Sequence, residues 1–285
     1  MSGRAVLISC DMEGVAGIVD WRQCTSPGTE YEMGRRLMLG EVNAAIDGCL
    51  AGGATRVVVN DAHGSVANAF ANLDPSELHG RAEYCSGRHK PLSMMQGLDS
   101  SFSAVMFVGY HGAMDGPPSV LSHTYNPRVV VGAALNGVGV GEGGINALCA
   151  LALGVPVAMV TGDRPAVDGC KSVLPGIVEV VVKESLSRFA AQSMHPLDAV
   201  DAVRRGAEEA MKRVERGVVP LPQIAMPASL SVELRHPDLA HFGAQLRGVQ
   251  VSGRSSVTIE EADPLVLYQR FVALLSLTRG LAAWD

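Results

Sequence analysis

The chain has 285 residues, of which 47% are hydrophobic and 18% are charged, and its formal net charge at pH 7 is -6. This composition excludes a largely disordered protein, because it supplies enough apolar surface to bury a sizeable core. It also argues against nucleic-acid binding, because there is no basic stripe and only 5% of the residues are aromatic.

The sequence predicts neither a signal peptide nor a membrane span. The first apolar run, residues 5–10, is too short for either and is followed at once by acidic residues, and no other run reaches about 18 apolar residues. The six cysteines form no Cys-x-x-Cys pair, and Cys10, Cys49 and Cys149 lie in apolar patterns typical of reduced core thiols. We therefore expect a cytoplasmic protein without a membrane partner.

Strand-like and helix-like segments alternate through the first two thirds of the chain. In chain order they are strand 5–10, helix 31–53, strand 56–62, strand 104–110, a strand or strand pair at 128–138, helix 144–154, strand 155–163, strand 178–185 and helix 196–217. The strands lack polar alternation, which is typical of a parallel sheet covered on both faces. The pattern predicts a doubly wound α/β domain with a mostly parallel sheet and helices on both faces.

The pattern changes in the last third, where residues 220–227 contain three prolines. The segments beyond them predict strands at 229–236 and 248–261 and a helix at 264–284. We therefore expect an α/β domain at 1–218 and a smaller C-terminal α+β domain at 219–285.

Asp11 and Glu13 directly follow the first predicted strand. Alternate residues on an extended chain point to the same side, so both carboxylates can face one ion. A solvated turn, or a helix cap made by Asp11, would explain the pair better if it stood alone. The apolar strand before it favours the metal site, because it places the pair at the carboxyl end of a strand.

Two histidines follow two further predicted strands in the same way. His63 ends the segment NDAH, in which Asp61 is close enough to orient an imidazole, and His111 ends GYH. A loop histidine would explain His63 alone. In an open α/β fold, however, the carboxyl ends of the strands converge on one crevice, so the repeated coincidence favours a shared site.

Glu142 lies within GVGEGG at 139–144, which formally matches the dinucleotide-binding pattern, and Asp163 follows about twenty residues later. The match is in the middle of the chain, and Glu142 would repel a pyrophosphate at the helix N-terminus. As a metal ligand Glu142 makes better sense, because the glycines allow the backbone to approach closely. Three carboxylates and two imidazoles are too many ligands for one zinc ion and predict a dinuclear hydrolytic centre.

His123 lies in the segment SVLSHT, among small and hydroxyl residues. It could be a ligand, a general acid or base, or a packed structural residue. An unligated histidine beside a metal centre suits proton transfer near neutral pH.

Taken in order, the motifs SCDMEG, NDAHGS, GYHGA, LSHT and VGEGGINA resemble those of the bacterial zinc-dependent D-aminopeptidase family, over roughly residues 5–190. The resemblance implies hydrolysis of the N-terminal residue, with D-amino acids preferred, from short peptides. It also implies a homo-oligomeric ring, two zinc ions per subunit and His123 as the catalytic histidine. An oxygen-rich ligand set could hold manganese or cobalt instead of zinc.

The resemblance also implies a role for each metal ligand. In this assignment Asp11 bridges the two ions, Glu13 and His63 complete one site, and His111 and Glu142 complete the other.

Two other functions are compatible with the residues. A dinuclear metallophosphoesterase would use the same kind of ligands, although Arg128 is the nearest candidate to hold a phosphate and basic residues near the motifs are scarce. A non-catalytic nucleotide-binding α/β module would use GVGEGG.

Overall fold

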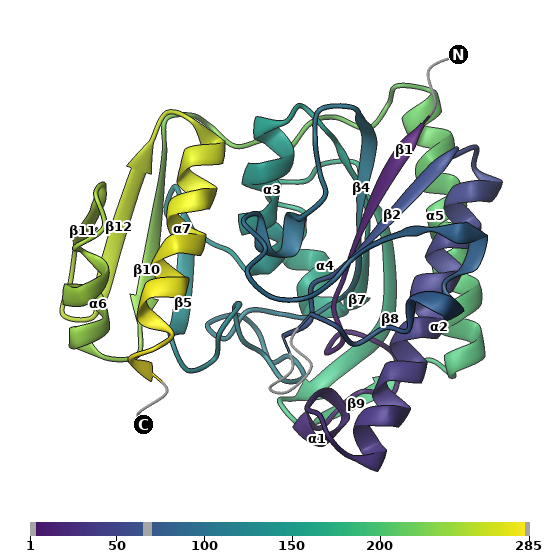
Figure 1. Ribbon diagram of the computed structural model, residues 1–285, viewed down its shortest axis with the longest axis horizontal. Coiled ribbons are helices and arrows are strands. Elements are labelled where there is room, and N and C mark those ends of the chain that lie inside the picture. Colours follow the sequence, from purple (N-terminus) through teal and green to yellow (C-terminus); the bar gives the residue numbers. More distant parts are fainter. Residues whose placement is uncertain (1–3, 65–69, 283–285) are drawn as a thin grey trace.

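Two β-sheets form the frame of the protein, and the computed structural model describes residues 4–64 and 70–282 (Figure 1). Sheet A contains, in spatial order, β3 (Glu83–Cys85), β2 (Arg56–Asp61), β1 (Ala5–Cys10), β4 (Phe102–Tyr110), β7 (Val157–Asp163), β8 (Val178–Ser187) and β9 (Ala190–Ser193). Sheet B contains β11 (Val249–Val251), β12 (Ser256–Glu261), β10 (Ala228–Leu234), β5 (Val130–Leu135) and β6 (Val138–Gly139).

Sheet A is parallel except for its last pair, β8 and β9, and sheet B is antiparallel. Strand β1 lies between β2 and β4, so the direction in which the chain adds strands reverses there. In doubly wound folds a crevice opens at this reversal, outside the carboxyl ends of the strands. The predicted α/β class, with a mostly parallel sheet and an additional smaller α+β unit, is confirmed.

Helices cover both faces of sheet A, as Figure 1 shows. Helices α2 (Thr29–Ala51) and α5 (Pro196–Glu215) pack against each other on one face, and α3 (Glu142–Ala152) and α4 (Arg164–Cys170) lie on the other. Successive residues of β1 point to opposite faces. Val6 and Ile8 accordingly belong to the core beneath α2 and α5, whereas Leu7 belongs to the core beneath α3.

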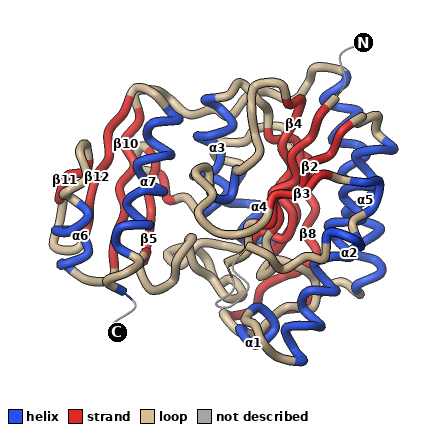
Figure 2. Tube along the Cα trace, viewed as in Figure 1, coloured by secondary structure: helices blue, strands red, loops and turns tan. Residues whose placement is uncertain are grey.

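Sheet B lies beyond α3, and the helix α7 (Pro264–Thr278) packs between them (Figure 2). The second helix that packs against sheet B is α6 (Pro237–Gly243). The remaining short helices are α1 (Trp21–Cys24) and the 3-10 turns Pro75–Glu77, His79–Arg81 and Ser93–Met95. No helix in the described part of the chain has the length and apolar character that a membrane crossing requires.

The segment 128–138 forms the strand pair β5 and β6, one of the two alternatives expected, but the pair belongs to the antiparallel sheet B and not to the parallel sheet. Asn136 and Gly137, between the two strands, have positive φ values of 52° and 80°. Such an Asn-Gly pair makes the tight turn of an antiparallel hairpin, which turns the chain away from sheet A. The Asn136 side chain then ties the turn to sheet B by accepting from the Ser229 N–H at 2.9 Å.

The predicted strand 248–261 is also different, since it is divided into β11 and β12, which pair antiparallel with each other. Sheet B therefore combines strands from both sides of residue 218. The division of the chain into units 1–218 and 219–285 stays a prediction.

Candidate metal centre

The predicted ligands follow three neighbouring strands of sheet A. Asp11 and Glu13 follow β1, His63 follows β2 and His111 follows β4. Cys10, the last residue of β1, is in register with Asp61 of β2 and Val108 of β4. The three strand ends are thus level with one another, and the polar residues after them are buried together, each 2–3% exposed.

One half of the centre is formed by His63 and the two carboxylates after β1. The His63 Nδ1 atom lies 3.1 Å from Asp11 Oδ1 and 3.0 Å from Glu13 Oε2. The His63 Nε2 atom lies 2.8 Å from the carbonyl oxygen of Cys24 and donates to it. This hydrogen bond leaves the lone pair of Nδ1 directed at the carboxylates, the arrangement that metal-binding histidines use.

The other half is formed by His111 and Glu142, the first residue of α3. The His111 Nε2 atom lies 3.5 Å from Asp11 Oδ2 and 3.6 Å from Glu142 Oε1. The His111 Nδ1 atom donates to the carbonyl oxygen of Gly112 at 3.0 Å, so its Nε2 carries the lone pair. The two oxygens of Asp11 therefore face the two halves of the centre.

Two buried atoms of this second half have no hydrogen-bond partner among the described residues. They are His111 Nε2 and Glu142 Oε2. An unsatisfied buried polar atom costs about 1–3 kcal/mol, and a cation between these groups would satisfy both. Ligand atoms of Asp11, Glu13 and His111 lie within 4.8 Å of one another, which is close enough to share an ion. The residues present therefore fit a metal site.

The pKa values of the buried groups follow from the crowding of charge. Burial raises the pKa of Glu142 to about 8, with His111 opposing and Asp11 adding to the shift. Burial acts in the opposite direction on His111, but the carboxylates of Glu142 and Asp11 outweigh it and raise its pKa to about 10. Burial likewise opposes the lowered pKa of Asp11, which the neighbouring imidazoles of His111 and His63 hold well below the usual range. A centre with three buried carboxylates thus favours bound positive charge.

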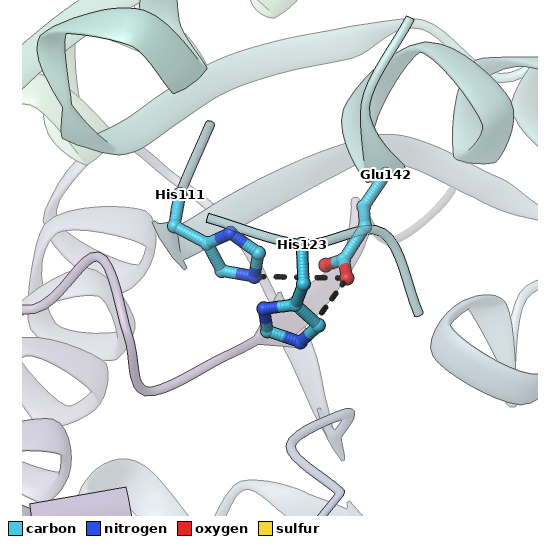
Figure 3. A group of neighbouring side chains, drawn as sticks. All are labelled: His111, His123 and Glu142. Carbon is cyan, nitrogen blue, oxygen red and sulfur yellow. Dashed lines mark ion pairs between the residues drawn. The ribbon is translucent and has the colours of Figure 1, made fainter. Parts of the chain in front are cut away.

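His123 comes from the loop between β4 and β5 and stacks on His111, with ring centroids 4.2 Å apart (Figure 3). Its Nδ1 donates to the carbonyl oxygen of Leu121 at 2.9 Å, and its Nε2 lies 4.0 Å from Glu142 Oε1. Burial and the neighbouring His111 lower the pKa of His123 to about 4. The free Nε2 therefore faces the centre as an unprotonated atom.

The arrangement of His123 also allows a second role. Ligand atoms of His111, His123 and Glu142 lie within 4.8 Å of one another, so that His123 could itself hold an ion. A cavity of about 420 Å³ opens onto the centre, and His123 lines it together with Asp11, Glu13, His63 and Glu142.

The structure thus brings all six predicted site residues together, but it gives Asp61 a different role from the expected one. Asp61 Oδ2 accepts from the backbone N–H groups of Asn72 and Leu73 instead of orienting the His63 ring. The side chain of Asn72 in turn donates to the carbonyl oxygen of His63 at 2.8 Å. Asp61 therefore holds the backbone of Asn72 and Leu73, and Cys24 orients the His63 ring.

The GVGEGG segment does not have the surroundings of a dinucleotide site. The strand before it is β6 of the antiparallel sheet B, and Glu142 is buried, with Oε1 accepting from the Tyr125 N–H at 2.7 Å. Asp163 caps α4 by accepting from the Ala166 N–H and also accepts from the Ser119 hydroxyl. It is therefore occupied within the fold, and the nucleotide-binding alternative is not favoured.

Lys183 on β8 is the supporting residue that sequence reasoning missed. It is 1% exposed, and its Nζ donates to the backbone carbonyl oxygens of Glu13, Val15 and Ile18 at 2.6, 3.0 and 2.7 Å. The lysine could have been found from the run VEVVVKES, because a charge that directly follows three valines in a strand must have partners when it is buried.

Comparison with known proteins gives concordant matches. A family model described as D-aminopeptidase matches residues 5–273. The D-aminopeptidase of Bacillus subtilis (strain 168) is 32% identical over 274 residues, covering 95% of this chain and 96% of the relative. The solved structure of the Zn-dependent D-aminopeptidase DppA from Bacillus subtilis, a self-compartmentalizing protease, matches with a TM-score of 0.86 and 31% identity. That match covers 96% of this chain and 98% of DppA. The fold, the buried ligand cluster and these matches lead to one conclusion: the chain belongs to the D-aminopeptidase family.

Proposed function

We propose that this protein is a dinuclear zinc aminopeptidase that removes N-terminal D-amino acids from short peptides. Asp11, Glu13, His63, His111 and Glu142 would hold the two ions, with Asp11 shared between them, Glu13 and His63 on one side and His111 and Glu142 on the other. One observation carries this assignment: Asp11 Oδ1 lies 3.1 Å from His63 Nδ1, while Oδ2 lies 3.5 Å from His111 Nε2. A single carboxylate with an imidazole at each oxygen is the geometry that a bridging ligand needs.

The metal pair, when bound, supplies Lewis acidity and lowers the pKa of water so that it becomes a nucleophile near neutral pH. The protein contributes the binding site and the path of the proton. Because Nδ1 of His123 is engaged by Leu121, its Nε2 is the atom that meets the substrate. In this assignment Nε2 accepts a proton during attack on the scissile carbonyl and returns it to the departing amine.

The remaining parts of the proposal are supported by the relatives. The Zn-dependent DppA supports zinc over manganese or cobalt, and its description as self-compartmentalizing supports a homo-oligomeric ring with enclosed sites. The name of the Bacillus subtilis relative supports D-residues at the cleaved position. A cytoplasmic location stays a prediction.

Metal analysis combined with peptide hydrolysis tests the proposal. We expect about two zinc ions per chain in purified protein, and release of D-alanine from D-Ala-D-Ala that stops on chelation and returns with zinc. L-Ala-L-Ala is the matched control and should be cleaved more slowly. Protein that holds zinc but releases phosphate from a generic ester, and leaves both peptides intact, would contradict the peptidase assignment.

A further inference from the structure

Three arginines enter the cavity at the metal centre from segments far apart in the chain. Arg128 precedes β5, Arg188 lies in the turn between β8 and β9, and Arg235 follows β10 of sheet B. All three line the same cavity as Asp11, Glu13, His63, His123 and Glu142. Two different sheets therefore direct positive charge at the space where a substrate would lie.

Two of these arginines hold the loop that carries His123. Arg188 Nη2 donates to the carbonyl oxygen of Ser122 at 3.3 Å, and Arg235 Nη2 donates to that of Pro127 at 3.2 Å. A guanidinium has five N–H groups in a rigid fork, so each of these contacts fixes the side chain and leaves further donors available.

No carboxylate of the described residues forms an ion pair with Arg128, Arg188 or Arg235. Other arginines on the surface do find such partners, for example Arg56 with Glu83 and Arg164 with Glu184. Three unpaired guanidinium groups around one cavity attract an anion, and their planar forks match the two oxygens of a carboxylate.

The one anionic group that every unmodified short peptide carries is its free C-terminal carboxylate. We propose that Arg128, Arg188 and Arg235 bind the C-terminal carboxylate of a short peptide whose first peptide bond lies at the metal centre. This proposal rests on the proposed function and adds the feature by which the substrate is selected. Each additional residue moves the C-terminal carboxylate up to about 3.6 Å farther from the first peptide bond. The arginines therefore select peptides by their length.

Steady-state kinetics with paired substrates tests the proposal. D-Ala-D-Ala carries the carboxylate, D-Ala-D-Ala amide lacks it, and D-Ala-D-Glu amide carries a carboxylate on the side chain only. For the wild type we expect KM to be about ten- to a hundred-fold lower for the free acid than for either amide, with kcat changing much less.

Substitution of the arginines should remove this preference. Arg128→Gln, Arg188→Gln and Arg235→Gln should each raise KM for the free acid by about ten-fold or more, change KM for D-Ala-D-Ala amide much less, and be partly rescued by Lys. Arg164→Gln, which removes an exposed arginine already paired with Glu184, is the matched control and should behave as the wild type. The native mass of each variant is measured in parallel.

The possible outcomes separate this proposal from the proposed function. Equal KM values for the acid and the amide in the wild type would overturn the carboxylate site while leaving the peptidase intact. A preference for D-Ala-D-Glu amide over the free acid would also overturn it, as would variants that lose activity because the native mass has changed. Absence of cleavage of all three substrates by zinc-loaded wild type would instead count against the proposed function.

Discussion

The side-chain ammonium of Lys183 lies 2.6 Å from the backbone carbonyl oxygen of Glu13. The segment after β1 is held from the other side by Glu41 of α2, whose Oε1 accepts from the Ala16 N–H at 2.9 Å. A buried cation thus binds carbonyl groups of this segment and a buried carboxyl group binds one of its N–H groups. The position of Glu13 in the candidate centre depends on both.

Replacing Lys183 with Met should weaken the metal centre as well as the fold. The variant keeps the apolar stem but leaves buried carbonyl groups unpaired, so we expect a loss of about 3 kcal/mol in the free energy of unfolding. Mutation of a group that supports a metal ligand typically lowers metal affinity by about 10–100-fold, so we also expect zinc to bind about ten-fold more weakly. Competition with a chelating dye measures the affinity and urea titration the stability.

Lys171→Met is the matched control for this change, because Lys171 is exposed and its ion-pair partners among the described residues are Asp168 and Glu179. It should leave zinc affinity unchanged. If Lys183→Met lowers stability while zinc affinity equals that of the control, Lys183 has no role in positioning Glu13.

Glu41 should make the stability of the protein depend on pH. Burial raises its pKa from 4.5 to about 7, while the bond from Ala16 and the charge of Lys183 oppose the shift. The folded state therefore holds the proton more tightly than the unfolded state. Stability from this group is fully present below pH 4.5 and is lost as the pH rises through about 7, a change of about 3 kcal/mol.

The variant Glu41→Gln carries no titrating group and should lose this dependence. We compare the free energies of unfolding of variant and wild type at about pH 5 and about pH 8, with chelator present at both. The difference, variant minus wild type, should be about 2 kcal/mol larger at the higher pH, because only the wild type loses stability. Glu260→Gln, at an exposed position of β12, should show no such rise. A difference between Glu41→Gln and wild type that stays constant with pH would argue against the raised pKa.

A methyl group at Gly109 should disturb the turn that positions Asp11. Gly109 has a φ of 74°, and a Cβ atom there would lie 2.3 Å from the carbonyl oxygen of Asp11. Gly137 has a φ of 80° but open space around it, so it provides a control with similar backbone strain and no clash. We expect Gly137→Ala to cost about 1 kcal/mol and Gly109→Ala about 2 kcal/mol more. Only Gly109→Ala should lower zinc content, and equal effects of the two would refute the close approach to Asp11.

Replacing His123 with Ala separates its catalytic role from metal binding. If Nε2 transfers the proton, kcat should fall by about a hundred- to ten-thousand-fold while zinc content stays at the wild-type value. His79→Ala, at a half-exposed histidine paired with Asp47, should retain full activity. Loss of one zinc ion from the His123 variant would instead identify His123 as a ligand beside His111 and Glu142.

Much of the centre could be predicted because it depends on local sequence. Asp11, His63 and His111 each follow an apolar strand, and the topology of a parallel sheet places the ends of such strands side by side. Glu142 lies beside these residues even though the hairpin before it belongs to the other sheet.

The parts that were not predicted depend on contacts between distant segments. The apolar run 128–138 looks the same whether it joins a parallel or an antiparallel sheet, and only the Asn136–Gly137 turn distinguishes the two cases. Lys183, Arg188 and Arg235 lie far along the chain from the ligands that they approach. Neither the spacing of motifs nor the hydrophobic periodicity of the sequence indicates which distant residues lie close together in the fold.

The pairing of β5 with β10 has a consequence for the newly made chain. Leu135 faces Leu230, so β5 leaves the ribosome long before its main partner strand exists. At a synthesis rate of about 5–20 residues per second the wait is on the order of ten seconds. During that time an apolar strand edge is open to pairing with other chains, and the nascent protein is most vulnerable to aggregation in the interval before sheet B is complete.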